Sequence, residues 1–88
     1  MRKTHFNIAK PDGQEEVKIT GLFRHNGRLL VIHNVDGHIS YRCSDYLTGM
    51  CFDNCESSYF KECKRFAKDK LDMNKDFDFS VLKQINKL

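Results

Sequence analysis

The sequence lacks the long apolar segments that insert into membranes. Nowhere in its 88 residues does an apolar run approach the roughly 18 residues that a transmembrane helix needs. The first residues, from Met1 to His5, contain no apolar core of a secretory signal. From both absences we expect a cytoplasmic protein without membrane contact.

Motifs of catalytic machinery are also missing. The sequence contains no Gly-rich phosphate loop, no G-x-G-x-x-G, no H-E-x-x-H and no G-x-S-x-G. Cysteines and histidines are present, but the strands predicted below place His33 and His38 on the face opposite Cys43, where they cannot activate its thiol. We therefore expect no enzymatic activity.

The sequence has little excess of either charge. Fifteen Lys and Arg against 12 Asp and Glu give a formal net charge of +3, below the strong basic excess typical of nucleic-acid-binding domains. Its 40% hydrophobic residues, without low-complexity runs, favour a folded globule. The length fits one domain, residues 1–88, near the lower size limit for domains that fold without disulfides or bound metals.

Turn signals organise the N-terminal half. Asn26-Gly27 and Asp36-Gly37 are typical of two-residue hairpin turns, because type I′ turns need positive φ at both central positions. They separate three β-prone runs at 17–25, 28–35 and 38–45. Before them, Pro11-Asp12-Gly13 follows a predicted edge strand at 5–10, and after them Gly49 precedes a short fifth strand at 50–52. The prediction is one antiparallel meander of four to five strands over about 4–52.

The two-residue turns also predict the strand register. The first pairs Phe23 with Leu30, and the second pairs Leu30 with Cys43 and Arg28 with Asp45. Alternate residues then form one apolar face that should meet the core. Its members are Val17, Ile19, Gly21, Phe23, Leu30, Ile32, Ile39, Tyr41 and Cys43.

The C-terminal half predicts two helices. Asp53 and Glu56 have the spacing of a capping box, and an amphipathic apolar stripe follows to about residue 73. We therefore expect a main helix over about 54–73, with Asn74 as its C-cap, packed on the apolar face of the sheet. Ser80 is expected to cap a short C-terminal helix over about 80–88. Sheet first and helices afterwards indicates the α+β class.

The second face of the predicted sheet is mixed, with basic side chains around an apolar patch. A patch of this kind usually marks a contact surface, whereas the alternative is a half-solvated sheet that the C-terminal segment covers. As a contact surface it would suit a partner protein or a second copy of the chain. The expected partner-binding residues are Lys18, Leu22, Arg24, Leu29, Val31, His33, Val35 and Arg42.

The four cysteines have an incomplete metal-site spacing. Cys51 and Cys55 are close enough to form one zinc knuckle, but no second pair exists. Without a secretory signal, a disulfide such as Cys43–Cys63 would not persist. We therefore interpret the cysteines as buried thiols and expect no cofactor. A zinc site of Cys43, Cys51, Cys55 and Cys63 is the alternative.

Part of the sequence resembles proteins of mobile elements. The residues are Ile39-Ser40-Tyr41-Arg42, Leu47-Thr48-Gly49-Met50, Glu56 and Phe66-Ala67. They resemble small phage accessory proteins of unknown function that end a strand, turn at Thr-Gly and enter an amphipathic helix. They also resemble the arm-site DNA-binding domain of phage-type integrases, in which a three-stranded sheet backed by a helix lays its open face in the major groove.

The first resemblance implies a non-enzymatic protein that inhibits or modulates a host protein complex, such as a nuclease or defence system, by occupying its surface. The second implies nucleic-acid binding, with Lys18, Arg24 and Arg42 on phosphates or bases. A zinc-stabilised module is a third hypothesis. We expect a protein partner in preference to nucleic acid.

Overall fold

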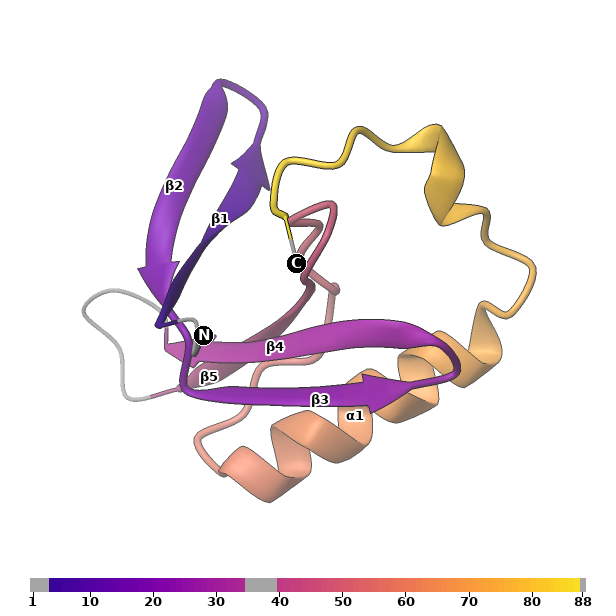
Figure 1. Ribbon diagram of the computed structural model, residues 1–88. Helices are drawn as coiled ribbons and strands as arrows, with labels where there is room; N and C mark the ends of the chain where they lie inside the picture. The colour runs from indigo at the N-terminus through magenta and orange to yellow at the C-terminus, as the bar shows by residue number, and fades with distance from the viewer. Residues whose placement is uncertain (1–3, 35–39, 88) are drawn as a thin grey trace.

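The computed structural model describes residues 4–34 and 40–87. Its strands form two antiparallel sheets (Figure 1). One sheet pairs β1 (His5–Lys10) with β2 (Gly13–Lys18), and the other has the order β3 (Gly21–His25), β4 (Arg28–Asn34), β5 (Tyr41–Asp45). A helix, α1 (Phe60–Met73), and a 3₁₀ turn (Phe79–Val81) follow. The α+β class is confirmed, whereas the predicted single meander is replaced by two sheets.

The expected strand at 17–25 is divided at Ile19 and Thr20. The backbone N–H of Ile19 donates to the carbonyl of Thr4 at 2.9 Å, beside β1, and that of Thr20 donates to the carbonyl of Ile32 at 2.8 Å, in β4. Successive residues thus pair with different sheets, and the chain turns out of the β1–β2 hairpin into β3. An alternating apolar pattern cannot reveal such a change of partner, because the alternation continues through it.

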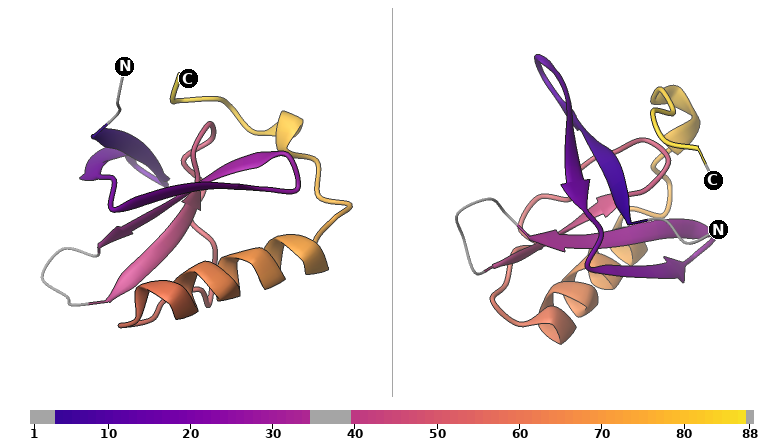
Figure 2. Two further views of the ribbon diagram at one scale, coloured as in Figure 1. Left: turned by 60° about the horizontal axis from the view of Figure 1, so that its bottom comes forward. Right: turned by 60° about the vertical axis from the view of Figure 1, so that its left-hand side comes forward.

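The sheet of β3, β4 and β5 is the middle layer of the molecule. Helix α1 covers one face, and the β1–β2 hairpin covers the other (Figures 1 and 2). Leu30 and Ile32 of β4 are packed towards α1, while Val31 is packed with Phe6 and Tyr46 on the hairpin side. The central strand is therefore buried on both faces.

The first predicted hairpin is confirmed. Phe23 lies opposite Leu30 and His25 opposite Arg28, and the turn residues Asn26 and Gly27 have φ values of 49° and 79°. A further glycine, Gly21, permits close approach of the helix, because a Cβ atom there would clash with the ring of Phe60. This contact places the start of α1 against β3.

The second register differs from the prediction by two residues. Cys43 lies opposite Ile32 instead of Leu30, and Asp45 lies opposite Leu30. The predicted turn, Asp36-Gly37, lies outside the described residues. Because side chains alternate with a period of two, a two-residue shift keeps every side chain on its predicted face. The predicted contact of Arg28 with Asp45 also survives, as a diagonal pair at 2.7 Å.

Helix α1 begins at Phe60, later than the predicted start at about residue 54. The backbone of Ser57 pairs with Tyr41 at the edge of β5, which excludes a helix there. Glu56 binds Ser40 and Arg42 instead of capping the helix. The C-cap at Asn74 is confirmed.

The predicted C-terminal helix at 80–88 is replaced by the 3₁₀ turn Phe79–Val81 and an irregular segment. Asn86 anchors this segment: its side-chain amide accepts from the N–H of Asn7 and donates to the carbonyls of Asn7 and Tyr46. Nor does 50–52 form a fifth strand, since Cys51 makes only a single bridge to Ser44. Gly49, which precedes this residue range, has a positive φ of 70°.

Candidate functional site

The face predicted to bind a partner is largely covered by the β1–β2 hairpin. Val31 and His33 are 0% and 2% exposed, so neither is available at the surface, and Leu29 is half-buried. Val35 lies outside the described residues. This is a correction to the expected open face: the N-terminal hairpin covers it, and the C-terminal segment binds β1 and the residues Tyr46 and Leu47 beside it.

The residues of that face that are still exposed lie at its margins. Leu22 is 49% exposed and Arg24 is exposed beside it on β3. Lys18 is exposed at the end of β2, while Arg42 is partly exposed and lies 3.7 Å from the Glu56 carboxylate. The structure separates these four residues, and their contact with a partner stays a prediction.

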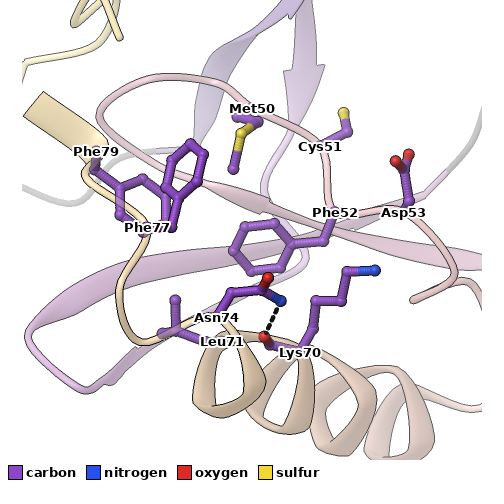
Figure 3. A pocket seen from close by; sticks show the side chains of 9 residues that line it. All are labelled: Met50, Cys51, Phe52, Asp53, Lys70, Leu71, Asn74, Phe77 and Phe79. Carbon is purple, nitrogen blue, oxygen red and sulfur yellow. Dashed lines mark hydrogen bonds between the residues drawn. The ribbon is translucent and has the colours of Figure 1, made fainter. Parts of the chain in front are cut away.

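A cleft opens on another side of the molecule, where three segments meet (Figure 3). The loop after β5 supplies Met50 to Asp53, the end of α1 supplies Lys70 to Asn74, and Phe77 and Phe79 close the third side. Its volume is about 160 Å³, enough for one aromatic or branched side chain. The lining residues are Met50, Cys51, Phe52, Asp53, Lys70, Leu71, Asn74, Phe77 and Phe79.

The aromatic wall of the cleft is held by defined contacts. The rings of Phe77 and Phe79 meet edge to face, with centroids 4.9 Å apart. The guanidinium of Arg28 lies 4.1 Å from the ring centroid of Phe79 and donates twice to the buried carboxylate of Asp45. A residue of β4 thereby fixes a residue of the C-terminal segment.

Exposed apolar side chains continue along the segment that borders this cleft. Met73, Phe77 and Val81 are 83%, 44% and 74% exposed. Only Leu22 and Tyr59 are comparable among the large hydrophobic residues of the described chain. Apolar side chains gathered around an apolar cleft are typical of contact surfaces.

Little in the sequence predicts this site. The notable signal is Phe77 and Phe79, which alternate with acidic residues in the stretch after α1. That stretch lies between the two predicted helices, at about 54–73 and 80–88, and no structure is predicted for it. The cleft itself depends on tertiary contacts that bring the loop after β5 to the end of α1.

A second, polar cluster lies under the β1–β2 hairpin. The Nε2 atom of His33 is 2.8 Å from the hydroxyl of Ser44, which in turn donates to the sulfur of Cys51 at 3.2 Å. Burial lowers the pKa of His33, aided by the charge of Arg42, while the backbone of Asn34 and Glu15 act in the opposite direction. The imidazole is therefore held neutral, and Ser44 accepts from its N–H.

This cluster lacks the parts of a nucleophilic triad. Nδ1 of His33, the atom that an orienting carboxylate would bind, has no hydrogen-bond partner among the described residues. The Ser44 hydroxyl is fully buried and already donates to Cys51. We interpret these hydrogen bonds as a means of satisfying buried polar groups. They lie beside the second core of the protein, which is the apolar cluster of Phe6, Ile8, Val31 and Tyr46 under the hairpin.

The cysteines lie in two places and all are free thiols. Cys43, Cys55 and Cys63 are in the core under α1, whereas Cys51 packs on the hairpin side. Burial raises the pKa of Cys43 and Cys55, and raises that of Cys63 to about 11. In residues 4–34 and 40–87 no three potential ligands are grouped to hold a metal ion, so the alternative four-cysteine zinc site is not assembled.

Comparison with protein-family models, curated proteins and solved structures finds no match to this chain. Within the described residues, no helix has the length and apolar character needed to cross a membrane.

Proposed function

We propose that the protein is a non-enzymatic binding protein whose contact with a protein partner is made by the cleft and the adjoining segment from Met73 to Val81. The observation that carries the proposal is an apolar cleft bordered by exposed apolar side chains. Buried apolar anchors supply most of the affinity of protein interfaces, and a cleft of this size accepts one such anchor from the partner.

The charges around the cleft agree with this proposal. Lys70 and Asp53 line it with opposite signs, so it has no basic excess that would favour phosphate. An origin in a mobile element, action as an inhibitor or modulator of a host complex, and a cytoplasmic location belong to the same proposal. They rest on the sequence resemblance to small phage accessory proteins.

The test is affinity capture from the native host, with nuclease treatment, using the wild-type protein and two variants. Met73→Ser removes an exposed side chain (83%) from the segment that adjoins the cleft, and Tyr59→Ser removes a comparably exposed one (70%) at the start of α1. We expect Met73→Ser to reduce recovery of the partner several-fold while Tyr59→Ser retains it. Equal recovery by both variants would refute the cleft as the contact, and loss of all partners on nuclease treatment would favour nucleic-acid binding.

A further inference from the structure

We propose that the free edge of β3 binds an acidic peptide segment in extended conformation, by adding it as a fourth strand to the sheet of β3, β4 and β5. This surface lies on the opposite flank of α1 from the cleft, because Lys64 and Lys68 contact β3 while Lys70 lines the cleft. The inference therefore does not rest on the proposed function, and either can fail alone.

Within the described residues, the outer edge of β3 is unpaired, whereas the outer edges of β5 and β1 are bound by other residues. The outer edge of β5 is occupied by bridges from Ser44 to Cys51 and from Tyr41 to Ser57. The outer edge of β1 binds Gly49 and Asn86. No described residue pairs with the outer edge of β3, which lies open beside α1 (Figures 1 and 2).

The register specifies which backbone groups are free at this edge. His25 and Arg28 flank the two-residue turn and form a hydrogen-bonded pair, so Phe23 with Leu30 and Gly21 with Ile32 do so as well. The N–H and C=O groups of Leu22 and Arg24 therefore point away from β4. They present two donors and two acceptors at the spacing that an added strand uses.

The side chains beside the outer edge of β3 are basic. The ammonium groups of Lys64 and Lys68 lie 5.0 and 5.9 Å from the ring centroid of Phe23, on the α1 side of the sheet. Arg24 is exposed on the other side. An added strand thus meets basic side chains on both of its faces, so carboxylates on either face would be complementary.

In the described part of the molecule these three cations form no ion pair, so their charges are available to a ligand. Arg28 pairs with Asp45 and Arg42 with Glu56, but no described carboxylate lies within ion-pair distance of Arg24, Lys64 or Lys68. The nearby acid Asp72 is bound to His25 and Asn26. The same charges oppose a second copy of the chain at this edge, because two β3 strands would bring like charges together.

The test uses a nine-residue peptide with Glu at alternate positions between Val and Thr, and its Lys counterpart. We expect the Glu peptide to bind in low salt and to slow amide hydrogen exchange at Leu22 and Arg24. The Lys peptide should bind more than tenfold more weakly. Absence of Glu-peptide binding, or exchange changes confined to other amides, would overturn the proposal.

Backbone methylation separates strand addition from general charge attraction, with the wild-type protein in every arm. One alternate set of peptide N–H groups faces β3 and the other faces solvent, so N-methylation of one set should abolish binding while methylation of the other preserves it. Equal binding by both methylated peptides would show attraction without strand pairing and overturn the proposal.

Charge reversal locates the site on the protein. Lys64→Glu/Lys68→Glu should weaken Glu-peptide binding more than tenfold and restore binding of the Lys peptide. The matched control, Lys83→Glu/Lys87→Glu, makes the same change of charge at two exposed residues of the C-terminal segment and should retain binding. Equal weakening by both variants, or concentration-dependent dimers of the wild-type protein through β3, would contradict the assignment.

Discussion

The two faces of the sheet formed by β3, β4 and β5 are buried by different means. The face under α1 packs apolar side chains around Leu30, Ile32 and Cys43. The face under the β1–β2 hairpin contains His33, Ser44 and Cys51 as well as Val31, and its polar groups bond to one another. Histidine and serine on a strand therefore do not by themselves indicate a solvated face.

The substitution Val31→Asp tests whether the face under the β1–β2 hairpin is a core, and we expect it to destabilise the protein most. Val31→Asp places a carboxylate where the side chain is 0% exposed, so we expect a loss of about 4 kcal/mol or more in the free energy of unfolding. Chemical denaturation followed by circular dichroism measures it. Leu22→Asp, at the exposed margin of the same face, should change stability little, and a folded Val31→Asp protein would refute the second core.

A smaller loss should follow from removing the polar anchor of the hairpin side. Asn86→Ala leaves the N–H of Asn7 and the carbonyls of Asn7 and Tyr46 without their partner, at a cost of about 1–3 kcal/mol. Hydrogen exchange should accelerate in β1 before α1. Uniform acceleration through both layers would show that the two cores unfold as one unit.

The buried His33 should make the stability of the hairpin face depend on pH. Because burial lowers the pKa of His33, the unfolded chain binds the proton first on acidification. The stability from neutral His33 is fully present above about pH 6.5 and decreases as the pH falls from there towards the folded-state pKa. Thermal unfolding of the wild type and of His33→Phe between pH 7 and 5 measures the slope. A slope unchanged in His33→Phe would assign it to other groups.

The smallest effect concerns the thiols. Burial raises the pKa values of Cys43, Cys55 and Cys63, so few thiolates form on the α1 side at pH 8. Cys51 is only partly buried. Brief alkylation of the native protein, followed by peptide mass spectrometry, should therefore modify Cys51 first. Faster modification of Cys43 would contradict the packing under α1.

Local signals predicted much of the fold. Asn26-Gly27 identified the first hairpin with its register, and period-two alternation assigned Leu30, Ile32 and Cys43 to the α1 face in spite of the shift at β5. Asn74 also has the expected role. Each of these features depends on neighbours in the sequence or on a single strand pair.

What could not be predicted depends on distant contacts. The division at Ile19 and Thr20 arises because their N–H groups pair with Thr4 and Ile32, and the late start of α1 arises because Ser57 pairs with Tyr41. One signal of two-sided burial was present: residues 29–32 are continuously apolar, as in strands that are covered on both faces. The cleft at Phe77 and Phe79 required the loop after β5 to reach the end of α1.

The β1–β2 hairpin packs over β4 and thereby buries most of the face that was predicted to bind a partner. Nuclear Overhauser effects between the ring protons of Phe6 and those of His33, whose ring centroids lie 5.6 Å apart, test this packing most directly. We expect cross-peaks from Phe6 to His33 and to the methyl groups of Val31. Their absence, with rapid hydrogen exchange in β1 and β2, would show that the hairpin leaves β4 exposed and would return that face to consideration as the contact surface.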